Sequence, residues 1–405
     1  MQRLEIIIVA FMYLWLANGP PALAAGPTKL SENIQYELLG HWDAQRLNTI
    51  LEVDTPKFSG LAVKYKAARN GARLYRVTYS SVVPEQNNRP IKATGLIAIP
   101  DISSASLPMV SYQHGTVFGK HEVPSQPENS SETLLMIAQF AGRGYVVIGA
   151  DYFGMGTTDE PEGYGVKASH QQATFDLLTA SRAILAHFNT SSNQLFLGGW
   201  SQGGFVTMAL LEKLEYLGIK VNAAGTAAGP VDISLLLRGF LQYPRPNDAS
   251  WISTLYILSA FSFETYYRVP GLARSLFQDD RYDLARKVYL RETYDLKELD
   301  LDLTKLIRKQ YFDPAYFASS PYGRIAEQTT AYRWAIATPV RNYYGENDEV
   351  ISVGLARLAM NYQHAAGRGN HNVQALTTGP TNHRGTFALA VSEWQTWFDS
   401  MAAIP

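Results

Sequence analysis

The chain contains no cysteine and carries almost no net charge. Its 405 residues include 35 Lys and Arg against 36 Asp and Glu, which gives a formal net charge of −1. Without disulfides, stability must come from a packed core. The balanced charge argues against a nucleic-acid partner, which selects a basic surface. A chain of this length predicts one large domain with an insertion, or two domains.

Motifs for metal ions and nucleotides are also missing. The histidines show no close-spaced ligand pattern such as His-Glu-x-x-His. The glycine-rich run from Gly199 to Gly204 is not followed by the Gly-Lys-Ser/Thr of a phosphate-binding loop. We therefore expect neither a metal ion nor another cofactor.

An apolar run that suggests a membrane occurs only near the N-terminus. Arg3 precedes apolar residues over 6–16, and the small-residue site Ala22-Leu23-Ala24 follows. This order is typical of a secretory signal peptide, so we predict that residues 1–25 are removed and that the mature protein is secreted or periplasmic, with no stable membrane span. An uncleaved anchor is the alternative, although the run is shorter than the roughly twenty residues that a span needs.

Strand-like runs alternate with helical runs along most of the chain. The first two runs are separated by a turn-prone segment and predict an antiparallel hairpin. The later runs alternate with helices, which implies parallel strands joined by right-handed crossovers. The sequence therefore predicts an α/β fold with a mostly parallel eight-stranded sheet flanked by helices. The predicted strands cover residues 74–83, 94–100, 108–113, 145–150, 195–199, 221–229, 340–344 and 373–377.

The alternation stops between the sixth and seventh predicted strands. Tyr, Phe and Leu recur there at helical spacing, so we expect a helical cap inserted after strand six rather than a long loop. Residues 29–71 are expected to be an N-terminal extension that packs onto the domain. The predicted organisation is a signal peptide over 1–25, a first part of the core over 26–230, the cap over 231–337, and a second part of the core over 338–405.

The motif Gly199-Trp200-Ser201-Gln202-Gly203 joins the fifth predicted strand directly to a helical run. Gly-x-Ser-x-Gly between a strand and a helix is typical of a nucleophile elbow, whose tight corner needs small residues on either side of the serine. The sequence therefore predicts that Ser201 is a nucleophile. The alternative is a glycine-rich turn between a core strand and a core helix.

A nucleophilic serine needs a histidine base, and that base needs a carboxylate that orients it. His383 follows the last predicted strand and Asp348 follows the strand before it. Both are therefore expected on loops at the carboxyl ends of the strands, where Ser201 is also expected. The chain order Ser, Asp, His fits this arrangement. The rivals are Glu346 and Glu349 for the carboxylate, and His364 and His371 for the base.

An oxyanion also needs preorganised N–H donors. The backbone of Gln202, directly after the nucleophile, is one expected donor. The loop after the third predicted strand reads His114-Gly115-Thr116 and is expected to supply a second donor from Thr116, with Gly115 as the alternative. His114 is expected to organise this loop and not to act as the base.

These motifs resemble those of α/β-hydrolases, and the resemblance covers about residues 74–401. Within that superfamily the chain is most similar to the secreted bacterial and fungal lipases and esterases of the secretory-lipase group. This likeness rests on the segments 114–116, 150–156 and 199–204. It implies the α/β-hydrolase fold, a triad of Ser201, Asp348 and His383, and a lid formed by the helical insertion.

We therefore predict a secreted serine hydrolase that cleaves carboxylic esters through an acyl-enzyme and takes a small-molecule or lipid ester. A serine peptidase of the prolyl-oligopeptidase type uses the same triad and remains an alternative. A non-catalytic binding protein built on the same fold is the second alternative. The acyl group, whether fatty, feruloyl or part of a polyester, stays open, as does the oligomeric state.

Overall fold

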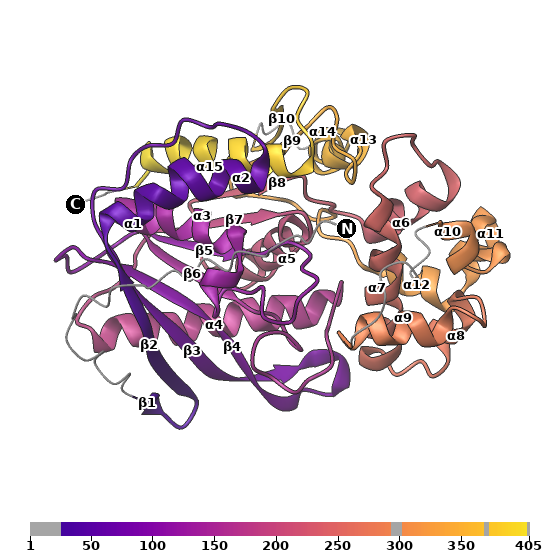
Figure 1. The fold of residues 1–405 in the computed structure, drawn as a ribbon, viewed down its shortest axis with the longest axis horizontal. Helices are drawn as coiled ribbons and strands as arrows, with labels where there is room; N and C mark the ends of the chain where they lie inside the picture. The colour runs from indigo at the N-terminus through magenta and orange to yellow at the C-terminus, as the bar shows by residue number, and fades with distance from the viewer. Residues whose placement is uncertain (1–25, 293–301, 368–371, 403–405) are drawn as a thin grey trace, which may run out of the picture.

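A ten-stranded mixed sheet forms the centre of the protein (Figure 1). The computed structural model describes residues 26–292, 302–367 and 372–402. The predicted signal peptide, residues 1–25, lies outside this described part.

The strands follow the order β1-β2-β3-β4-β6-β5-β7-β8-β9-β10 across the sheet. Neighbours from β6 to β10 are parallel, whereas β1 to β4 pair antiparallel with one another and β4 pairs antiparallel with β6. The strands are β1 (Thr28–Ser31), β2 (Ile34–Trp42), β3 (Ala72–Val83), β4 (Arg89–Pro100), β5 (Met109–Gln113), β6 (Val146–Ala150), β7 (Leu195–Trp200), β8 (Ala223–Ala227), β9 (Val340–Tyr344) and β10 (Val373–Thr377).

The sheet has two more strands than the eight that the sequence predicts. The predicted hairpin is β3 and β4, and the other six predicted strands are β5 to β10. The additional strands β1 and β2 come from the expected N-terminal extension, and β2 pairs antiparallel with β3. β1 is the edge strand and β2 lies next to it, and the residues of both are only half-buried or exposed, so their sequences lack the apolar pattern that marks the inner strands.

Helices cover both faces of the sheet (Figure 1). On one face α4 (Lys167–His187) packs beside α5 (Gln202–Tyr216). On the other face α3 (Ser131–Phe140) packs beside α15 (His383–Asp399), and α1 (Ala44–Thr49) and α2 (Thr55–Ser59) lie outside them. The remaining helical segments of the core are η1 (Ile50–Asp54), η2 (Pro84–Gln86), η3 (Pro127–Asn129), η4 (Ala141–Arg143), α13 (Val353–Ala356) and α14 (Leu358–Ala365).

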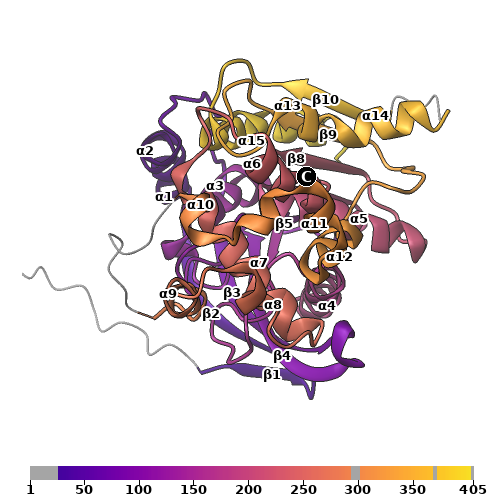
Figure 2. The same ribbon diagram turned by 90° about the vertical axis from the view of Figure 1, so that its right-hand side faces the viewer.

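The segment between β8 and β9 is helical and gathers at one end of the sheet (Figure 1). Figure 2 faces that end and shows these helices in front of the strands. We call them the cap. They are α6 (Ile233–Gln242), η5 (Ser250–Ile252), α7 (Ser253–Tyr266), α8 (Leu272–Leu276), α9 (Tyr282–Tyr289), α10 (Leu303–Leu306), η6 (Lys309–Phe312), α11 (Pro314–Ser319) and α12 (Pro321–Gln328).

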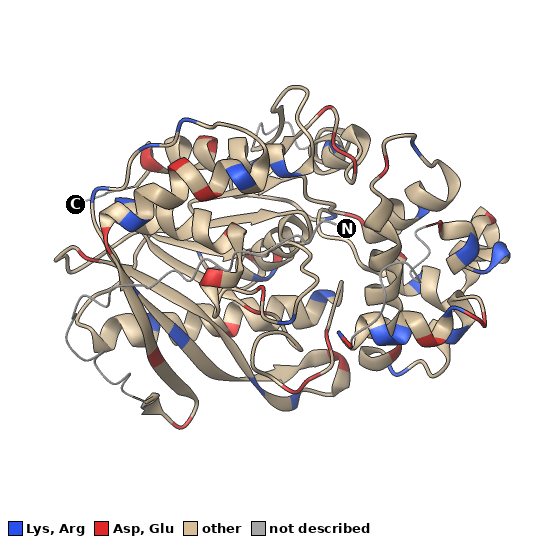
Figure 3. Ribbon diagram, viewed as in Figure 1, with Lys and Arg blue, Asp and Glu red and all other residues tan. Residues whose placement is uncertain are grey.

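Charges of both signs are interspersed over the core and the cap (Figure 3). Across the described ranges, every helix is too short or too polar to cross a membrane.

Helix α15 rests on the sheet through one large side chain. Trp394 is fully buried and lies against Gly198 of β7 and Gly225 of β8. A Cβ atom on Gly225 would come within 2.5 Å of the Trp394 ring, and one on Gly198 within 3.3 Å. The two glycines therefore make the shallow place on the sheet that the indole fills.

Trp394→Ala is expected to lower the free energy of unfolding by about 3–5 kcal/mol, because it leaves a cavity between α15 and the sheet. Urea denaturation followed by circular dichroism measures this. Tyr216→Ala is the control: Tyr216 is 89% exposed at the end of α5, so its loss should change the free energy by no more than about 0.5 kcal/mol. Equal effects of the two substitutions would contradict the packing described here.

Candidate active site

Ser201 stands at a sharp corner between β7 and α5. Its backbone has φ 56° and ψ −123°, a conformation that non-glycine residues rarely adopt. The main chain holds the corner, because the N–H of Ser201 donates to Ala227 O at 2.9 Å and the Ser201 carbonyl accepts from Gly204 N at 2.8 Å. Such strain is found where a side chain must stand clear of its own strand and helix.

Glycines on both sides of Ser201 allow three stretches of main chain to approach closely. A Cβ atom on Gly199 would lie 2.2 Å from the carbonyl oxygen of Gly203. A Cβ atom on Gly203 would lie 1.9 Å from the carbonyl oxygen of Gln113, at the end of β5. The predicted requirement for small residues in the motif therefore has a direct steric cause.

Asp348 and His383 lie together, as the sequence predicts for a base and its orienting carboxylate. The Nδ1 atom of His383, the first residue of α15, lies 3.0 Å from both carboxylate oxygens of Asp348. Asp348 Oδ1 also accepts the backbone N–H groups of Val350 and Ile351, each at 2.8 Å. Both side chains are buried, so these hydrogen bonds compensate the carboxylate for lost hydration and fix the imidazole with Nδ1 protonated.

The other ring nitrogen of His383 is left free to act. Nε2 is buried and has no hydrogen-bond partner within residues 26–292, 302–367 and 372–402. The ring packs against Trp200, the residue before Ser201, with centroids 4.9 Å apart, and Trp200 Nε1 donates to the His383 carbonyl at 3.1 Å. Trp200 therefore ties the nucleophile's strand to the start of α15.

The rival residues take other places. Glu349 accepts the backbone N–H of His383 at 2.9 Å, so it helps to position the base through the main chain. Glu346 accepts from Thr377 Oγ1 at 3.0 Å on the exposed surface, and His364 is exposed in α14. His371 lies outside the described residues.

The two predicted oxyanion donors are available. Among the described residues, the backbone N–H groups of Gln202 and Thr116 donate no hydrogen bond. The alternative donor, Gly115, is occupied, because its N–H donates to Glu132 Oε2 at 2.8 Å. The Thr116 hydroxyl contacts Tyr164 Oη at 2.8 Å, which ties this loop to the edge of the cavity beside Ser201.

His114 braces the loop from behind. It is buried, its Nδ1 lies 2.8 Å from the carbonyl oxygen of Gly115, and its ring stacks on Tyr152 with centroids 4.1 Å apart. Burial lowers the pKa of His114 to about 4, so its ring is neutral at neutral pH. This geometry fits the organising role that the sequence suggests for it.

Three groups around the site had no signal in the sequence. His170 of α4 is buried with Nε2 3.3 Å from the side-chain Nε2 of Gln202, and burial lowers the pKa of His170 to about 3. Glu132 of α3 and Tyr112 of β5 form a buried hydrogen bond behind Gly115. His170 and Glu132 come from parts of the chain distant from the sequence motifs, so only the fold brings them to the site, whereas Tyr112 lies just before the loop 114–116.

An apolar cavity opens beside Ser201 under the cap. Its volume is about 20 Å³, about the room that one water molecule needs. Residues of α6 and α7 form one wall, and residues after β9 form another. The lining consists of Tyr164, Gly165, Ser201, Gln202, Phe205, Pro230, Ile233, Leu236, Leu237, Leu255, Ser259, Val350 and Ile351.

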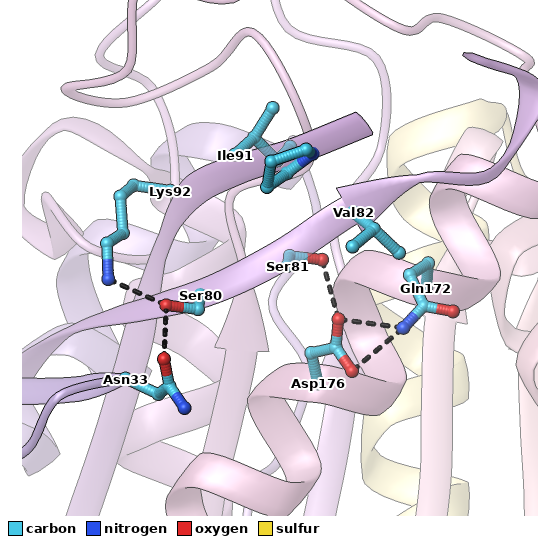
Figure 4. A pocket seen from close by; sticks show the side chains of 9 residues that line it. Asn33, Ser80, Ser81, Val82, Ile91, Lys92, Gln172 and Asp176 are labelled. Carbon is cyan, nitrogen blue, oxygen red and sulfur yellow. Dashed lines mark hydrogen bonds between the residues drawn. The ribbon is translucent and has the colours of Figure 1, made fainter. Parts of the chain in front are cut away.

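A second hollow of about 750 Å³ lies elsewhere, over the β3–β4 hairpin and α4 (Figure 4). It is polar: Lys92 donates to Ser80, and Ser81 donates to Asp176 at 2.6 Å. Ser201, Asp348 and His383 do not line it. Among the described residues, no group of three or more His, Asp or Glu side chains is placed to hold a metal ion.

Comparison with known families finds a sequence match around Ser201. The sequence model of the prolyl oligopeptidase family matches residues 131–226, which run from α3 to β8 and include Ser201. The match covers less than half of the chain. No curated protein sequence matches the chain significantly.

Solved structures resemble nearly the whole chain. A crystal structure from Legionella pneumophila superposes with a TM-score of 0.79 at 20% identity, covering 91% of this chain and 98% of that one. The rice cell wall degrading esterase LipA from Xanthomonas oryzae gives 0.75 at 20% identity, with 90% and 96% covered. Candida antarctica lipase A in its closed state gives 0.60 at 14% identity, with 91% and 83% covered.

These likenesses confirm the predicted α/β-hydrolase fold and the resemblance to esterases and lipases of that fold. Together with the family match they support a serine hydrolase. The roles of Ser201, Asp348, His383, Gln202 and Thr116 remain predictions that the geometry favours.

Asp348→Asn is expected to slow the labelling of Ser201 by a fluorophosphonate by roughly 10³–10⁴-fold, because an amide holds the imidazole in the wrong tautomer. Mass spectrometry of the labelled peptide measures the rate. Glu346→Gln removes the neighbouring rival carboxylate and should leave the rate unchanged. If Glu346→Gln slowed labelling more than Asp348→Asn, Glu346 and not Asp348 would be the carboxylate that orients His383.

Proposed function

We propose that this protein is a serine hydrolase that cleaves carboxylic esters through an acyl-enzyme. The observation that carries the proposal is the buried hydrogen bond between His383 and Asp348. It leaves the Nε2 atom of His383 without a partner among the described residues, and the same ring packs against Trp200, the residue before Ser201. A nucleophilic serine, a tautomer-fixed base and two free N–H donors are the parts that acyl transfer requires.

The reaction follows from these parts. Ser201 Oγ attacks the ester carbonyl while His383 Nε2 takes the hydroxyl proton. The N–H groups of Gln202 and Thr116 stabilise the oxyanion, and loss of one such donor typically costs about 2.7–4 kcal/mol. His383 then gives its proton to the leaving alcohol. Water, activated by the same nitrogen, attacks the acyl-enzyme and releases the acid.

The lining of the cavity supports an apolar acyl group as the bound part of the substrate. Most of its lining residues are apolar, and Ser201 is one of its few polar residues. The described structure leaves room for only about one water molecule there. A substrate therefore has to displace cap residues, which supports the predicted role of the cap as a lid.

Several contacts hold the cap against the core. Arg291, after α9, forms a 2.7 Å ion pair with Glu162 and donates to the Phe118 carbonyl at 2.7 Å. Phe118 also packs edge-to-face on Trp251 of η5, with centroids 5.8 Å apart. Phe118 lies two residues after Thr116. We therefore expect a movement of the cap to change the position of the Thr116 N–H as well.

The neighbours named as an esterase and a lipase support ester substrates, small or lipid, for this chain. We further propose that the protein is exported and acts in a secreted or periplasmic location, which rests on the N-terminal sequence alone.

A serine peptidase is the second candidate, and the match to the prolyl oligopeptidase family favours it. The matched segment is the core around the nucleophile, which esterases and peptidases of this fold share. Residues 26–130 contribute strands to the same sheet instead of a separate domain that selects peptides. Ester cleavage therefore remains the leading proposal.

The first test compares hydrolysis of p-nitrophenyl esters by the wild type and by Ser201→Ala. The variant is expected to lose activity at least about 10³-fold, because it lacks the nucleophile. Matched acyl p-nitroanilides serve as the amide counterparts. Rapid ester turnover with slow amide turnover supports the esterase, whereas preference for the anilide would favour the peptidase. A folded wild type that cleaves neither would favour the binding protein.

Leu255→Ala is expected to shift the acyl preference towards chains longer by one or two carbons. Leu255 of α7 is buried in the cavity wall, and each methylene newly buried contributes about 0.8 kcal/mol, or about fourfold in kcat/KM. The acyl-length profile of p-nitrophenyl esters measures this. Leu217→Ala, at an exposed residue after α5, is the control. An unchanged profile in Leu255→Ala would show that the acyl group does not bind in this cavity.

A further inference from the structure

A buried carboxyl group lies directly behind the loop that carries the proposed oxyanion donor. Glu132, the second residue of α3, is only 5% exposed. Its Oε2 atom accepts the backbone N–H of Gly115 at 2.8 Å and the hydroxyl of Tyr112. The reaction described above gives this carboxyl group no role, although burying it is costly.

The contacts of Glu132 fix the loop from one side. A Cβ atom on Gly115 would lie 3.2 Å from Glu132 Oε1 and 3.2 Å from a ring carbon of Trp200. The main chain at Gly115 is therefore held between the carboxyl group and the indole that packs on His383. The next N–H along the chain belongs to Thr116, so its direction depends on this clamp.

The charge of Glu132 acts on the base. Burial raises the pKa of the Glu132 carboxyl to about 7, while hydrogen bonds from Tyr112 and Gly115 and the charges of His383 and Arg384 act in the opposite direction. Glu132 also interacts with Tyr152. Burial raises the pKa of Tyr152, and the charge of Glu132 raises it further. The two residues whose charges lower the Glu132 pKa, His383 and Arg384, thus lie at the start of α15.

We propose that Glu132 is a positioning residue of the catalytic centre: its carboxylate aims the N–H of Thr116 through Gly115, and its negative charge stabilises the imidazolium that His383 forms. The inference rests on the proposed serine-hydrolase function. During the reaction no proton moves to Glu132, and no bond to it forms or breaks. The carboxylate acts by holding the loop in place and by its electrostatic effect on the imidazole.

The sign of the pH dependence follows. Ionised Glu132 is the active form, and as the pH falls through about 7 the carboxyl group is protonated and its charge is lost. The acid limb of the wild-type rate is therefore expected to include the protonation of Glu132. Glu132→Gln removes this protonation, so the acid limb is expected to move to lower pH by at least about 0.5 unit and to become less steep.

The experiment measures kcat and KM for a soluble p-nitrophenyl ester and the rate of fluorophosphonate labelling, both from pH 5 to 9. Glu132→Gln keeps the size and an acceptor oxygen but lacks the charge. We expect kcat at pH 8 to fall about tenfold with KM little changed, together with the displaced acid limb. Glu128→Gln is the matched control, because Glu128 is exposed just before α3, and it should behave as the wild type.

A purely structural role for Glu132 would lower the melting temperature of Glu132→Gln without moving the acid limb. Superimposed pH profiles for Glu132→Gln and the wild type would overturn the inference while leaving the serine hydrolase intact. A folded wild type that neither turns over esters nor reacts with the fluorophosphonate would overturn the proposed function and the inference with it.

If Glu132→Gln does not fold, Tyr112→Phe tests the same point. It removes one donor from the carboxylate, so Glu132 is protonated at higher pH and the acid limb should move upwards, opposite to the shift expected for Glu132→Gln. An acid limb that stays in place in Tyr112→Phe would overturn the inference.

Discussion

The corner at Ser201 is the constraint on which the rest of the site depends. Its positive φ turns the chain from β7 into α5 without a loop, and the carbonyl of Gln113 lies where a Cβ atom on Gly203 would stand. The end of β5 is thereby pressed against the start of α5. Because the loop 114–116 leaves β5 at this point, the same packing sets the start of the loop that carries the proposed donor Thr116.

The proposed base, His383, is positioned by core packing. Trp394 seats α15 on glycines of β7 and β8, and Trp200 packs against the imidazole of His383. The first residue of α15 is thus fixed relative to the end of β7, which carries Ser201. Asp348 completes the arrangement from the loop after β9. This chain, which has no cysteine, holds these three distant segments together partly by packing a large aromatic side chain against small residues.

The sequence was informative where one residue alone carries a constraint. Glycines around Ser201 and the places of Asp348 and His383 after successive strands could be identified because local geometry requires them. β2 escaped prediction because its residues are only half-buried or exposed and therefore show no clear apolar pattern. Glu132 escaped because a glutamate in the first turn of a helix is ordinary there. Its partners come from β5 and its loop, and only the tertiary structure brings them together.

Burial selects the charge states around the site. Burial lowers the pKa of both His114 and His170, so both rings are neutral at neutral pH and are weaker bases than an ordinary histidine. The apolar cavity lowers the local dielectric further, which makes each remaining N–H donor and carboxylate more effective. A closed cap strengthens this effect but leaves little room for substrate. In the proposed mechanism, opening of the cap admits the ester and closing removes water again, so the cap and the groups beneath it would act together.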